Sequence, residues 1–245
     1  MKRLGWEVIT VAAAKSTSLS KWESLEDNAI INAMYSDILV MRHPEPGSVR
    51  TTSDATDTPV INAWDGANQH PTQALLDVYT ILKERWKLDN LKISIVWDLK
   101  YGRTTHSLAF LMWLYKNVTF SFISPVELKM PQKVTTFLDE KNIPYEETID
   151  YKVGIKDADV IYVTRLQKER FTDISEYERL KNDFILTKDV LTSGKSDITI
   201  MHPLPRVNEV DHEVDALPNA AFFRQAQNGV PIRMALLYLL LKDSK

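Results

Sequence analysis

The chain has 245 residues, of which 44% are hydrophobic, so it can bury one large core or two smaller ones. Its formal net charge is −3 and its charges are interspersed, which argues against a nucleic-acid or membrane-surface partner. The absence of cysteine excludes disulfides, thiolate catalysis and Cys-ligated zinc. No apolar run has the length of a membrane span or the plan of a signal peptide, so we expect a cytoplasmic protein.

Short apolar and β-branched runs alternate with helical patterns along the chain. The predicted strands are 7–11, 37–42, 60–63, 93–97, 120–125, 159–165, 183–187, 197–203 and 220–225. The predicted helices are 24–35, 71–86, 105–116, 131–141, 174–181 and 230–242. This alternation predicts an α/β protein, most regular from residue 93 to 225, with a parallel sheet covered by helices on both faces. The helix that begins at Pro71 is expected to bridge an N-terminal unit and a second unit.

Cationic and polar residues follow several of these strands, at the edge where parallel α/β sheets bind their ligands. The candidates are Arg42, Arg103, Arg165, Gln167, Leu204 and Pro205. Guanidinium groups bind carboxylate and phosphate bidentately, so the pattern favours one or two small substrates with several negative charges. For any single arginine the alternative is a solvated or salt-bridged surface residue.

His70 directly precedes Pro71, which suits the first position of a helix because proline lacks the N–H that would be unsatisfied there. The free N–H groups and the positive dipole end of that helix favour a phosphate or a developing oxyanion, and a neutral imidazole could donate one hydrogen bond to it. Gln73, one turn into the helix, could bind an amide. The alternative is a histidine that only satisfies the backbone at a helix start.

Six ordered motifs resemble the catalytic chains of the aspartate carbamoyltransferase family. They are "MRHPEPG", "NQHPTQALLDVYT", "DLKYGRTTHSL", "YVTRLQKERF", "MHPLPRVNEVDHEVD" and "FRQAQNGVPIRMALL". The resemblance implies transfer of a carbamoyl group from carbamoyl phosphate to L-aspartate in pyrimidine biosynthesis, without a cofactor or metal. It also implies a carbamoyltransferase fold of two parallel-sheet domains. Residues 1–82 with 228–245 would bind carbamoyl phosphate and residues 83–227 would bind aspartate.

The resemblance also assigns roles to the candidate residues. Arg42, His70 and Gln73 would hold carbamoyl phosphate, and Arg103 and Arg165, assisted by Gln167, would clamp the two carboxylates of aspartate. The backbone carbonyls of Leu204 and Pro205 would receive the substrate amines. Lys21 and Ser18, less surely Thr17 or Ser20, would reach the active site of a neighbouring subunit in a homotrimer, and regulatory chains could bind as further partners.

Two departures from the family pattern bear on activity. A Ser-Thr-Arg-Thr motif that cradles the phosphate is expected upstream of "MKRLGW", so the N-terminal domain is expected to be truncated. The tryptophans at 6, 22, 64 and 97 stand where the family has glycine, or another small residue at position 6. The alternatives are therefore a non-catalytic carbamoyltransferase-like subunit and, since "HPLPR" lacks the cysteine of its counterpart segment, less favourably an ornithine carbamoyltransferase.

Glycine is scarce in this chain and tryptophan is frequent. Seven glycines among 245 residues are about 3%, against an average near 7%. We hypothesise that some or all of the six tryptophans, at 6, 22, 64, 86, 97 and 113, are glycines in the native protein, encoded by UGA. "NAWDG" and "VWDLK" would then carry glycine where close approaches and positive φ angles are expected.

Overall fold

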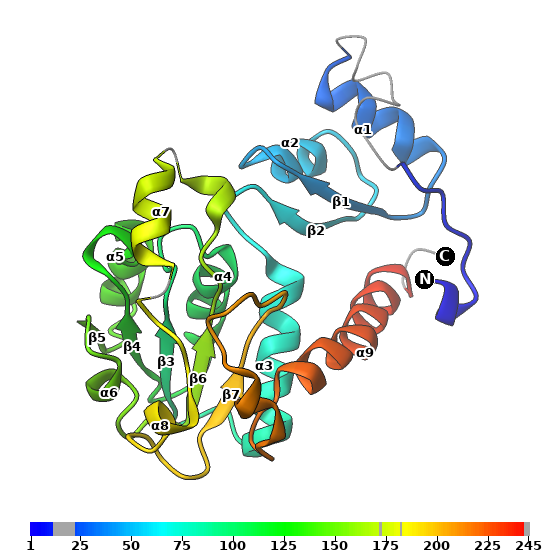
Figure 1. Ribbon diagram of the computed structural model, residues 1–245. Coiled ribbons are helices and arrows are strands. Elements are labelled where there is room, and N and C mark those ends of the chain that lie inside the picture. Colours follow the sequence, from blue (N-terminus) through cyan, green and yellow to red (C-terminus); the bar gives the residue numbers. More distant parts are fainter. Residues whose placement is uncertain (12–22, 172, 182, 243–245) are drawn as a thin grey trace. The chain divides into compact units, whose positions relative to one another are not determined.

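The computed structural model describes residues 1–11, 23–171, 173–181 and 183–242 (Figure 1). The chain divides into two compact units. The first comprises Met1–Thr72 and Gly229–Lys245, and the second comprises Gln73–Asn228. Among the helices of the described ranges, none combines the length and the apolar character that crossing a bilayer requires.

The first unit contains a small parallel sheet. Its elements are η1 (Lys2–Leu4), α1 (Leu25–Met34), β1 (Leu39–His43), α2 (Ser48–Asp54) and β2 (Val60–Asp65). Strands β1 and β2 pair in parallel, with a register shift between Met41 and Arg42. Helix α1 begins after Ser24, whose hydroxyl accepts a hydrogen bond from the Asp27 N–H at 3.0 Å.

The second unit is a five-stranded parallel sheet with helices on both faces. Its elements are α3 (Pro71–Arg85), β3 (Lys92–Val96), α4 (Arg103–Met112), β4 (Thr119–Ile123), η4 (Val126–Leu128), α5 (Gln132–Glu140), β5 (Tyr145–Thr148), α6 (Tyr151–Gly154), β6 (Val160–Val163), η5 (Lys168–Arg170), α7 (Ile174–Leu180), α8 (Lys188–Leu191), β7 (Thr199–Met201) and η6 (His212–Ala216). The strand order is β5-β4-β3-β6-β7, and every pairing is parallel. Helix α9 (Phe222–Leu241) follows.

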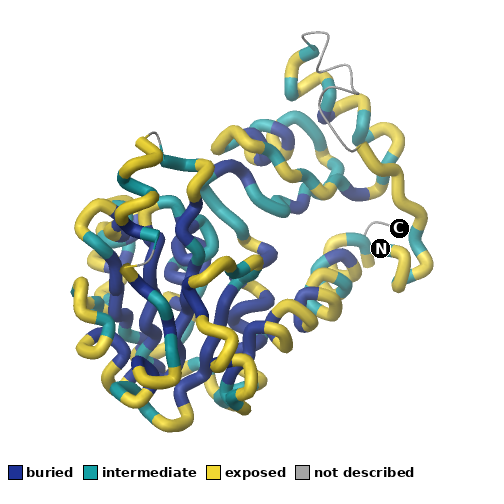
Figure 2. Tube along the Cα trace, in the orientation of Figure 1, coloured by how far each residue is buried: buried dark blue, intermediate teal, exposed yellow. Residues whose placement is uncertain are grey.

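Alternation along the strands builds a core on each face of this sheet. Ile93 and Ile95 of β3 pack with residues of α3, α4 and α5, whereas Val96 packs with residues of α7 and α8. The strands are the most deeply buried part of the second unit (Figure 2). Because successive side chains of a strand point to opposite faces, one apolar run serves both cores. The predicted α/β class with parallel sheets covered on both faces is confirmed.

Three predicted strands are wrong. Residues 220–225 lead into and form the first turn of α9, because their apolar run continues into a helical pattern. Residues 183–187 make only one bridge, between Leu186 and Val210. Residues 7–11 are exposed and pair with no strand of the described residues, so β-branched composition alone does not make a ladder there.

Strand β5 was missed by the sequence analysis. Its sequence, Tyr145–Thr148, carries two glutamates, and it lies at the edge of the sheet, where polar side chains are tolerated. The short helix α2 was missed as well, because its seven residues offer too short a window for a helical period.

Candidate functional site

Arg42 lies near the carboxyl end of β1, where the sequence predicts an anion-binding residue. Its side chain is exposed, and its guanidinium carbon lies 5.0 Å from the centre of the Trp64 ring. Trp64 is the residue opposite Arg42 on the neighbouring strand β2. A cation stacked on an indole face gains a favourable electrostatic contact. The indole therefore occupies one side of the arginine at this strand edge.

Asp65, the last residue of β2, ties together the loops that follow β1 and β2. Its carboxylate accepts hydrogen bonds from the backbone N–H groups of Gly47 (3.0 Å) and Gln69 (3.2 Å) and from the side-chain amides of Asn62 (3.0 Å) and Asn68 (2.9 Å). Burial raises the pKa of Asp65, but the four hydrogen bonds outweigh it and leave the pKa below its usual value. Asp65 is thus an ionised anchor for the segment that leads to His70.

His70 stands immediately before Pro71, the first residue of α3, as the sequence predicts. Its side chain is half-buried. The N–H groups of the first turn after it have no partner within the helix, and the helix dipole adds positive potential there. Gln73 is buried in that turn, and its Nε2 donates to Asp77 Oδ1 at 2.9 Å. The Gln73 side chain is therefore oriented by a partner on its own helix.

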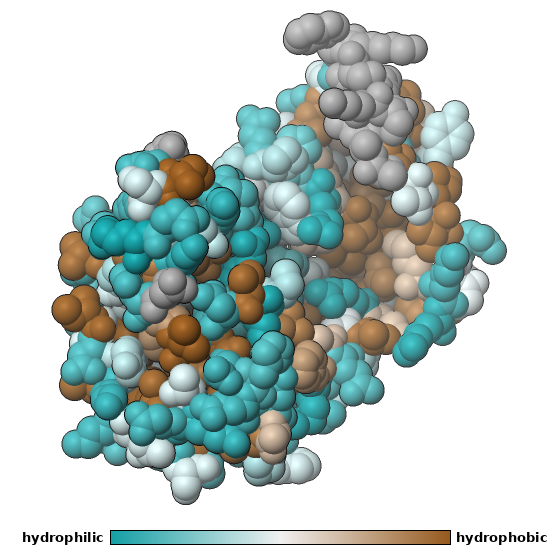
Figure 3. Space-filling model, viewed as in Figure 1, coloured by the Kyte–Doolittle hydropathy of each residue, from teal (hydrophilic) through white to brown (hydrophobic). Residues whose placement is uncertain are grey.

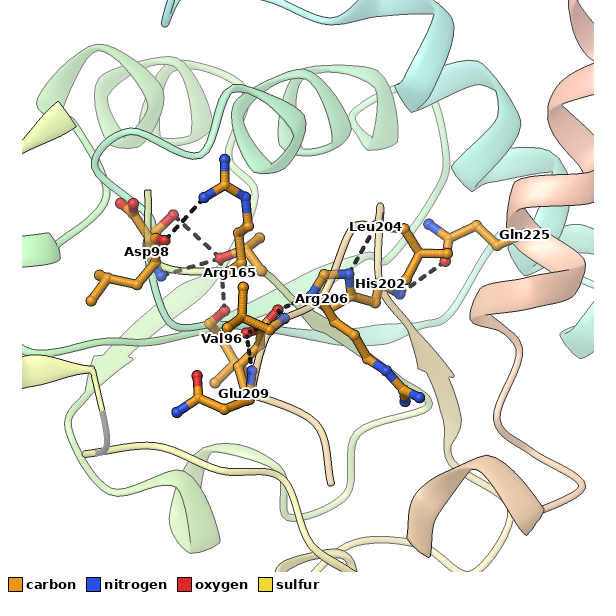
Figure 4. A network of polar contacts seen from close by, with 12 residues as sticks. Val96, Asp98, Arg165, His202, Leu204, Arg206, Glu209 and Gln225 are labelled. Atoms are coloured by element: carbon orange, nitrogen blue, oxygen red, sulfur yellow. Dashed lines mark hydrogen bonds and ion pairs between the residues drawn. The ribbon is translucent and has the colours of Figure 1, made fainter. Parts of the chain in front are cut away.

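Asp77 is a buried hub inside the second unit. Besides Gln73, it accepts hydrogen bonds from Tyr162 Oη at 2.8 Å and from Gln225 Nε2 at 2.7 Å. Burial, followed by the Asp77 charge, raises the pKa of Tyr162 well above its usual value, so the phenol stays protonated as a donor. Gln225 in turn accepts from the His202 N–H at 2.9 Å (Figure 4). These bonds link α3 to β6 and to the segment after β7.

Arg103 and Arg165 follow neighbouring strands of the five-stranded sheet. Arg103 is the first residue of α4, which follows β3, and Arg165 comes two residues after β6. Arg165 is ion-paired with Glu169, and Nη1 of Arg165 also donates to the Leu166 carbonyl at 3.3 Å. Hydrogen bonding to Glu169 raises the pKa of Arg165, which therefore remains a full positive charge. The two predicted clamp residues thus follow neighbouring strands at the same edge of the sheet, Arg103 at the start of α4 and Arg165 on a loop.

Asp98, which the sequence analysis did not select, joins these two loops (Figure 4). Its carboxylate accepts from the backbone N–H groups of Tyr101 at 3.0 Å and Gln167 at 3.2 Å, and its own N–H donates to Thr164 Oγ1 at 3.1 Å. Burial raises the pKa of Asp98 to about 6, against the opposing hydrogen bonds and the Arg165 charge. Asp98 is placed to hold Arg103, Arg165 and Gln167 in register.

A buried His202–Glu209 pair shapes the loop after β7 (Figure 4). Nδ1 of His202 accepts from the Leu204 N–H at 2.8 Å, so Nε2 carries the proton and donates to Glu209 Oε1 at 2.7 Å. Burial raises the pKa of Glu209, but hydrogen bonds from His202 and from backbone N–H groups outweigh it and leave the pKa lowered. Leu204, with a φ of 55°, and Pro205 are joined by a cis peptide bond. The loop that carries the Leu204 and Pro205 carbonyls is therefore anchored to the protein interior by the hydrogen bonds of His202.

The structure assembles the predicted residues in two groups. Arg42 and His70 belong to the first unit, whereas Gln73, Arg103, Arg165, Gln167, Leu204 and Pro205 belong to the second. Lys21, Ser18, Thr17 and Ser20 lie outside the described residues. Asp65, Asp98 and Glu209 are not among the residues predicted from the sequence. The available signal for the first two was an acidic residue directly after an apolar strand, in "NAWD" and "SIVWD".

Comparisons with known proteins match both parts of the chain. Residues 1–83 match the aspartate/ornithine carbamoyltransferase carbamoyl-P binding domain, and residues 89–240 match the aspartate/ornithine carbamoyltransferase Asp/Orn binding domain. The aspartate carbamoyltransferase catalytic subunit of Methanocaldococcus jannaschii is 49% identical over 245 residues, covering 100% of this chain and 79% of its own length. The Bacteroides fragilis catalytic subunit is 50% identical over 236 residues, covering 96% of this chain and 76% of its own length.

Solved structures give the same result. The M. jannaschii catalytic subunit of aspartate transcarbamoylase superposes with a TM-score of 0.89 at 48% identity, over 99% of this chain and 79% of that one. Aspartate transcarbamoylase from Trypanosoma cruzi, in complex with N-(phosphonacetyl)-L-aspartic acid (PALA), gives a TM-score of 0.89 at 37% identity, over 97% of this chain and 76% of that one. With identity near 50% along its whole length, this chain belongs to the family of aspartate carbamoyltransferase catalytic subunits.

Proposed function

We propose that this chain transfers the carbamoyl group of carbamoyl phosphate to L-aspartate, giving N-carbamoyl-L-aspartate and phosphate. The observation that carries the proposal is the pair of arginines, Arg103 and Arg165, each two residues from a backbone N–H, of Tyr101 and of Gln167, that donates to the buried Asp98. A dicarboxylate needs two cationic partners at a fixed separation, and a buried anchor between the two loops sets that separation. The family to which the chain belongs supports the same reaction.

The aspartate half of the reaction falls to the second unit. Each guanidinium would bind one carboxylate through two parallel N–H···O bonds, which a lysine cannot form. In the structure Glu169 occupies this fork of Arg165, so a substrate carboxylate would take the place of Glu169. Gln167, whose backbone N–H is held by Asp98, would assist with its side-chain amide.

Carbamoyl phosphate would be held by Arg42, His70 and Gln73. Arg42 and the N-terminal turn of α3 would supply positive potential for the phosphate and for the oxyanion that forms at the carbonyl. His70 would donate a hydrogen bond to that oxygen. The carbonyls of Leu204 and Pro205 would accept from the substrate amino groups, in a loop held by the His202–Glu209 pair.

The chemistry follows from the substrates. The amino group of aspartate attacks the carbonyl carbon of carbamoyl phosphate, a C–N bond forms, and the C–O bond to phosphate breaks. The phosphate leaves with the bonding electron pair and accepts the proton that the amine loses. Because the carbonyl is already activated as a mixed anhydride, positioning of the two reactants and stabilisation of the oxyanion supply most of the acceleration. Lys21 would add positive charge from outside the described residues.

We also propose that the chain works as a homotrimer with shared active sites. The first unit exposes many apolar side chains, which gather on its surface in Figure 3. The exposed large apolar side chains of this unit are those of Val8, Ile9, Val11, Ile30, Ile31, Met34, Tyr35, Val40, Val230, Tyr238, Leu239 and Leu240. Exposed apolar area of this kind marks interaction surfaces. Regulatory chains and a cytoplasmic location stay predictions from the sequence.

Mixing tests the shared site. Co-assembled Lys21→Ala and His70→Ala chains should regain part of the activity that each lacks alone, because one kind of site in the mixed trimer has both residues intact. Mixed chains that stay as inactive as the separate ones, although size-exclusion chromatography shows trimers, would contradict sharing.

A product assay tests the reaction itself. The protein is incubated with carbamoyl phosphate and either L-aspartate or L-ornithine, and carbamoylated products are measured by mass spectrometry. We expect N-carbamoyl-L-aspartate only, since an arginine pair suits two carboxylates. Citrulline as the main product would support the ornithine alternative. Calorimetric binding of carbamoyl phosphate with no product from either amine would support the non-catalytic alternative.

A further inference from the structure

Three tryptophans have positive φ angles: Trp86 at 55°, Trp97 at 96° and Trp64 at 157°. Bulky L-residues rarely adopt such angles because Cβ collides with the backbone, whereas glycine adopts them freely. We infer that glycine stands at positions 64, 86 and 97 in the native protein. Trp64 lies at the border of extended backbone, so backbone strain is greater at Trp86 and Trp97.

Trp86 gives the clearest backbone argument. It follows the last residue of α3, its N–H donates to the Leu82 carbonyl at 2.8 Å, and its left-handed angle ends the helix. Glycine is the usual residue at this position and asparagine is the usual substitute. The chain places asparagine at other left-handed positions, including Asn90 and Asn142 at φ of 55° and 54°. Trp86 is 87% exposed, so burial does not compensate for the backbone strain.

Trp97 and Trp64 share a second feature: each directly precedes a buried aspartate, Asp98 or Asp65, that accepts hydrogen bonds from the loops at its strand end. Trp97 follows β3, and its N–H donates to the Ile123 carbonyl at 2.9 Å, a bond that glycine would keep. Trp64 lies beside the register shift between β1 and β2, a place where a strand glycine is common. The Trp97 ring is buried against Phe184, whereas the Trp64 ring covers Arg42 at the edge where ligands of parallel sheets bind, so glycine at position 64 would uncover that arginine.

One cause accounts for all three positions. Tryptophan is encoded by UGG, whereas UGA is read as a stop, as tryptophan or as glycine according to the genetic code of the organism. A gene that uses UGA for glycine, translated as if UGA meant tryptophan, yields tryptophan wherever that codon occurs. Of the remaining tryptophans in the described residues, Trp113 has a φ of −63° and its ring contacts Phe137, so the backbone there does not require glycine.

Thermal unfolding tests the backbone argument, with Trp113→Gly as the matched control at another helix end. Trp86→Gly should raise Tm by roughly 2–4 °C, since removing the strain outweighs the gain in chain entropy of the unfolded state. Trp113→Gly should lower Tm, because it gives up ring contacts at a residue with helical φ. If both variants lower Tm by the same amount, the inference at position 86 is overturned.

Trp64→Gly adds a readout that rests on the proposed function. Calorimetric titration with inorganic phosphate should show several-fold tighter binding than the Trp64 chain, since Arg42 loses its stacking partner. Unchanged phosphate affinity together with a raised Tm for Trp86→Gly would count against Arg42 as a phosphate ligand and leave the glycine inference standing. The two failures are therefore distinguishable.

The native protein gives the direct answer. Peptides that span residues 64, 86 and 97, isolated from the natural source, should have the mass expected for glycine at each position, and the codons should be UGA. Tryptophan masses at these positions, or UGG codons, would overturn the inference.

Discussion

Two buried aspartates, Asp65 in the first unit and Asp98 in the second, each accept hydrogen bonds from backbone N–H groups of nearby loops. The pKa of Asp65 is nevertheless lowered, whereas the pKa of Asp98 is raised. Each directly follows a tryptophan at the carboxyl end of a parallel strand, and each ties together loops that carry candidate ligand residues. Burial raises the pKa of both. For Asp65 four hydrogen bonds outweigh burial, and for Asp98 burial prevails and the pKa reaches about 6.

The deeper burial of Asp98 and the smaller number of donors to its carboxylate account for the difference. Asp65 receives two backbone and two side-chain hydrogen bonds, whereas the carboxylate of Asp98 receives two from the backbone, with the charges of Arg165 and Glu169 acting in opposite senses. A carboxylate with more donors is a stable anion. Asp98 is less well satisfied, so its ionisation depends on the groups around it, including any anionic substrate held by Arg165.

The largest effect is expected for Asp65→Asn. An asparagine can accept at one oxygen only and turns an N–H₂ group toward two of the donors, so the free energy of unfolding of the first unit near neutral pH should fall by about 2–4 kcal/mol. Because the folded pKa is depressed, this deficit should shrink as the pH falls below the ordinary aspartate range. Urea unfolding measures it, with the exposed Asp54→Asn as control. A loss no larger than that of the control would contradict the anchor role.

Asp98→Asn should show the opposite pH dependence. The folded pKa of about 6 lies above the unfolded value, so the wild type loses stability as the pH rises from about 4 to above 6, by about 3 kcal/mol. The variant does not titrate, so its stability relative to wild type should improve by that amount between pH 4 and pH 7. Urea unfolding at several pH values tests this, with exposed Asp139→Asn as control. A difference between variant and wild type that is constant with pH would refute the raised pKa.

Arg165→Lys should weaken aspartate recognition while the charge remains. Loss of one bidentate pair is worth about 1.5–3 kcal/mol, so kcat/KM for aspartate should fall roughly ten- to a hundredfold. Arg103→Lys should behave in the same way. Steady-state kinetics measure the change, and Arg179→Lys, an exposed ion-paired arginine on α7, is the matched control. An unchanged aspartate dependence in Arg165→Lys would remove that residue from the clamp.

The smallest effect is expected for Tyr162→Phe. The variant removes one of the three hydrogen bonds to Asp77 described above, which should lower the free energy of unfolding by about 1 kcal/mol. Tyr145→Phe is the control, because its hydroxyl faces the exposed Asp139 at 3.4 Å and should contribute little. Thermal unfolding compares the two. Equal losses would indicate that the buried hub contributes no more than a surface contact.

The sequence predicted the strands and the arginines at the edge of the sheet, but not the buried carboxylate that holds the segments after those strands. Apolar runs and their alternation with helices located β3, β4, β6 and β7, because burial on both faces demands such runs. Arg103 and Arg165 were found because guanidinium groups at strand ends are conspicuous. Asp98 was not, because its role comes from burial and from N–H groups of residues 101 and 167, and sequence pattern does not reveal which backbone donors converge on a side chain.

Local patterns also failed where neighbours decide the structure. Residues 220–225 have strand-like composition, but the helix that they begin is determined by the apolar pattern that follows. The His202–Glu209 pair was missed because a histidine beside proline predicts no particular partner seven residues away. The positive φ angles expected at Trp64 and Trp97 are present in the structure. They could be predicted because "NAWDG" and "VWDLK" place these residues at tight turns after strands.

Calorimetric titration with PALA, which joins a phosphonate to aspartate, tests most directly whether both groups of residues serve one reaction. We expect one tight binding event per chain, weakened at least tenfold by Arg42→Ala and, separately, by Arg165→Lys, with the affinity of Arg179→Lys unchanged. No binding of PALA by the folded protein, or binding that neither Arg42→Ala nor Arg165→Lys alters, would contradict it.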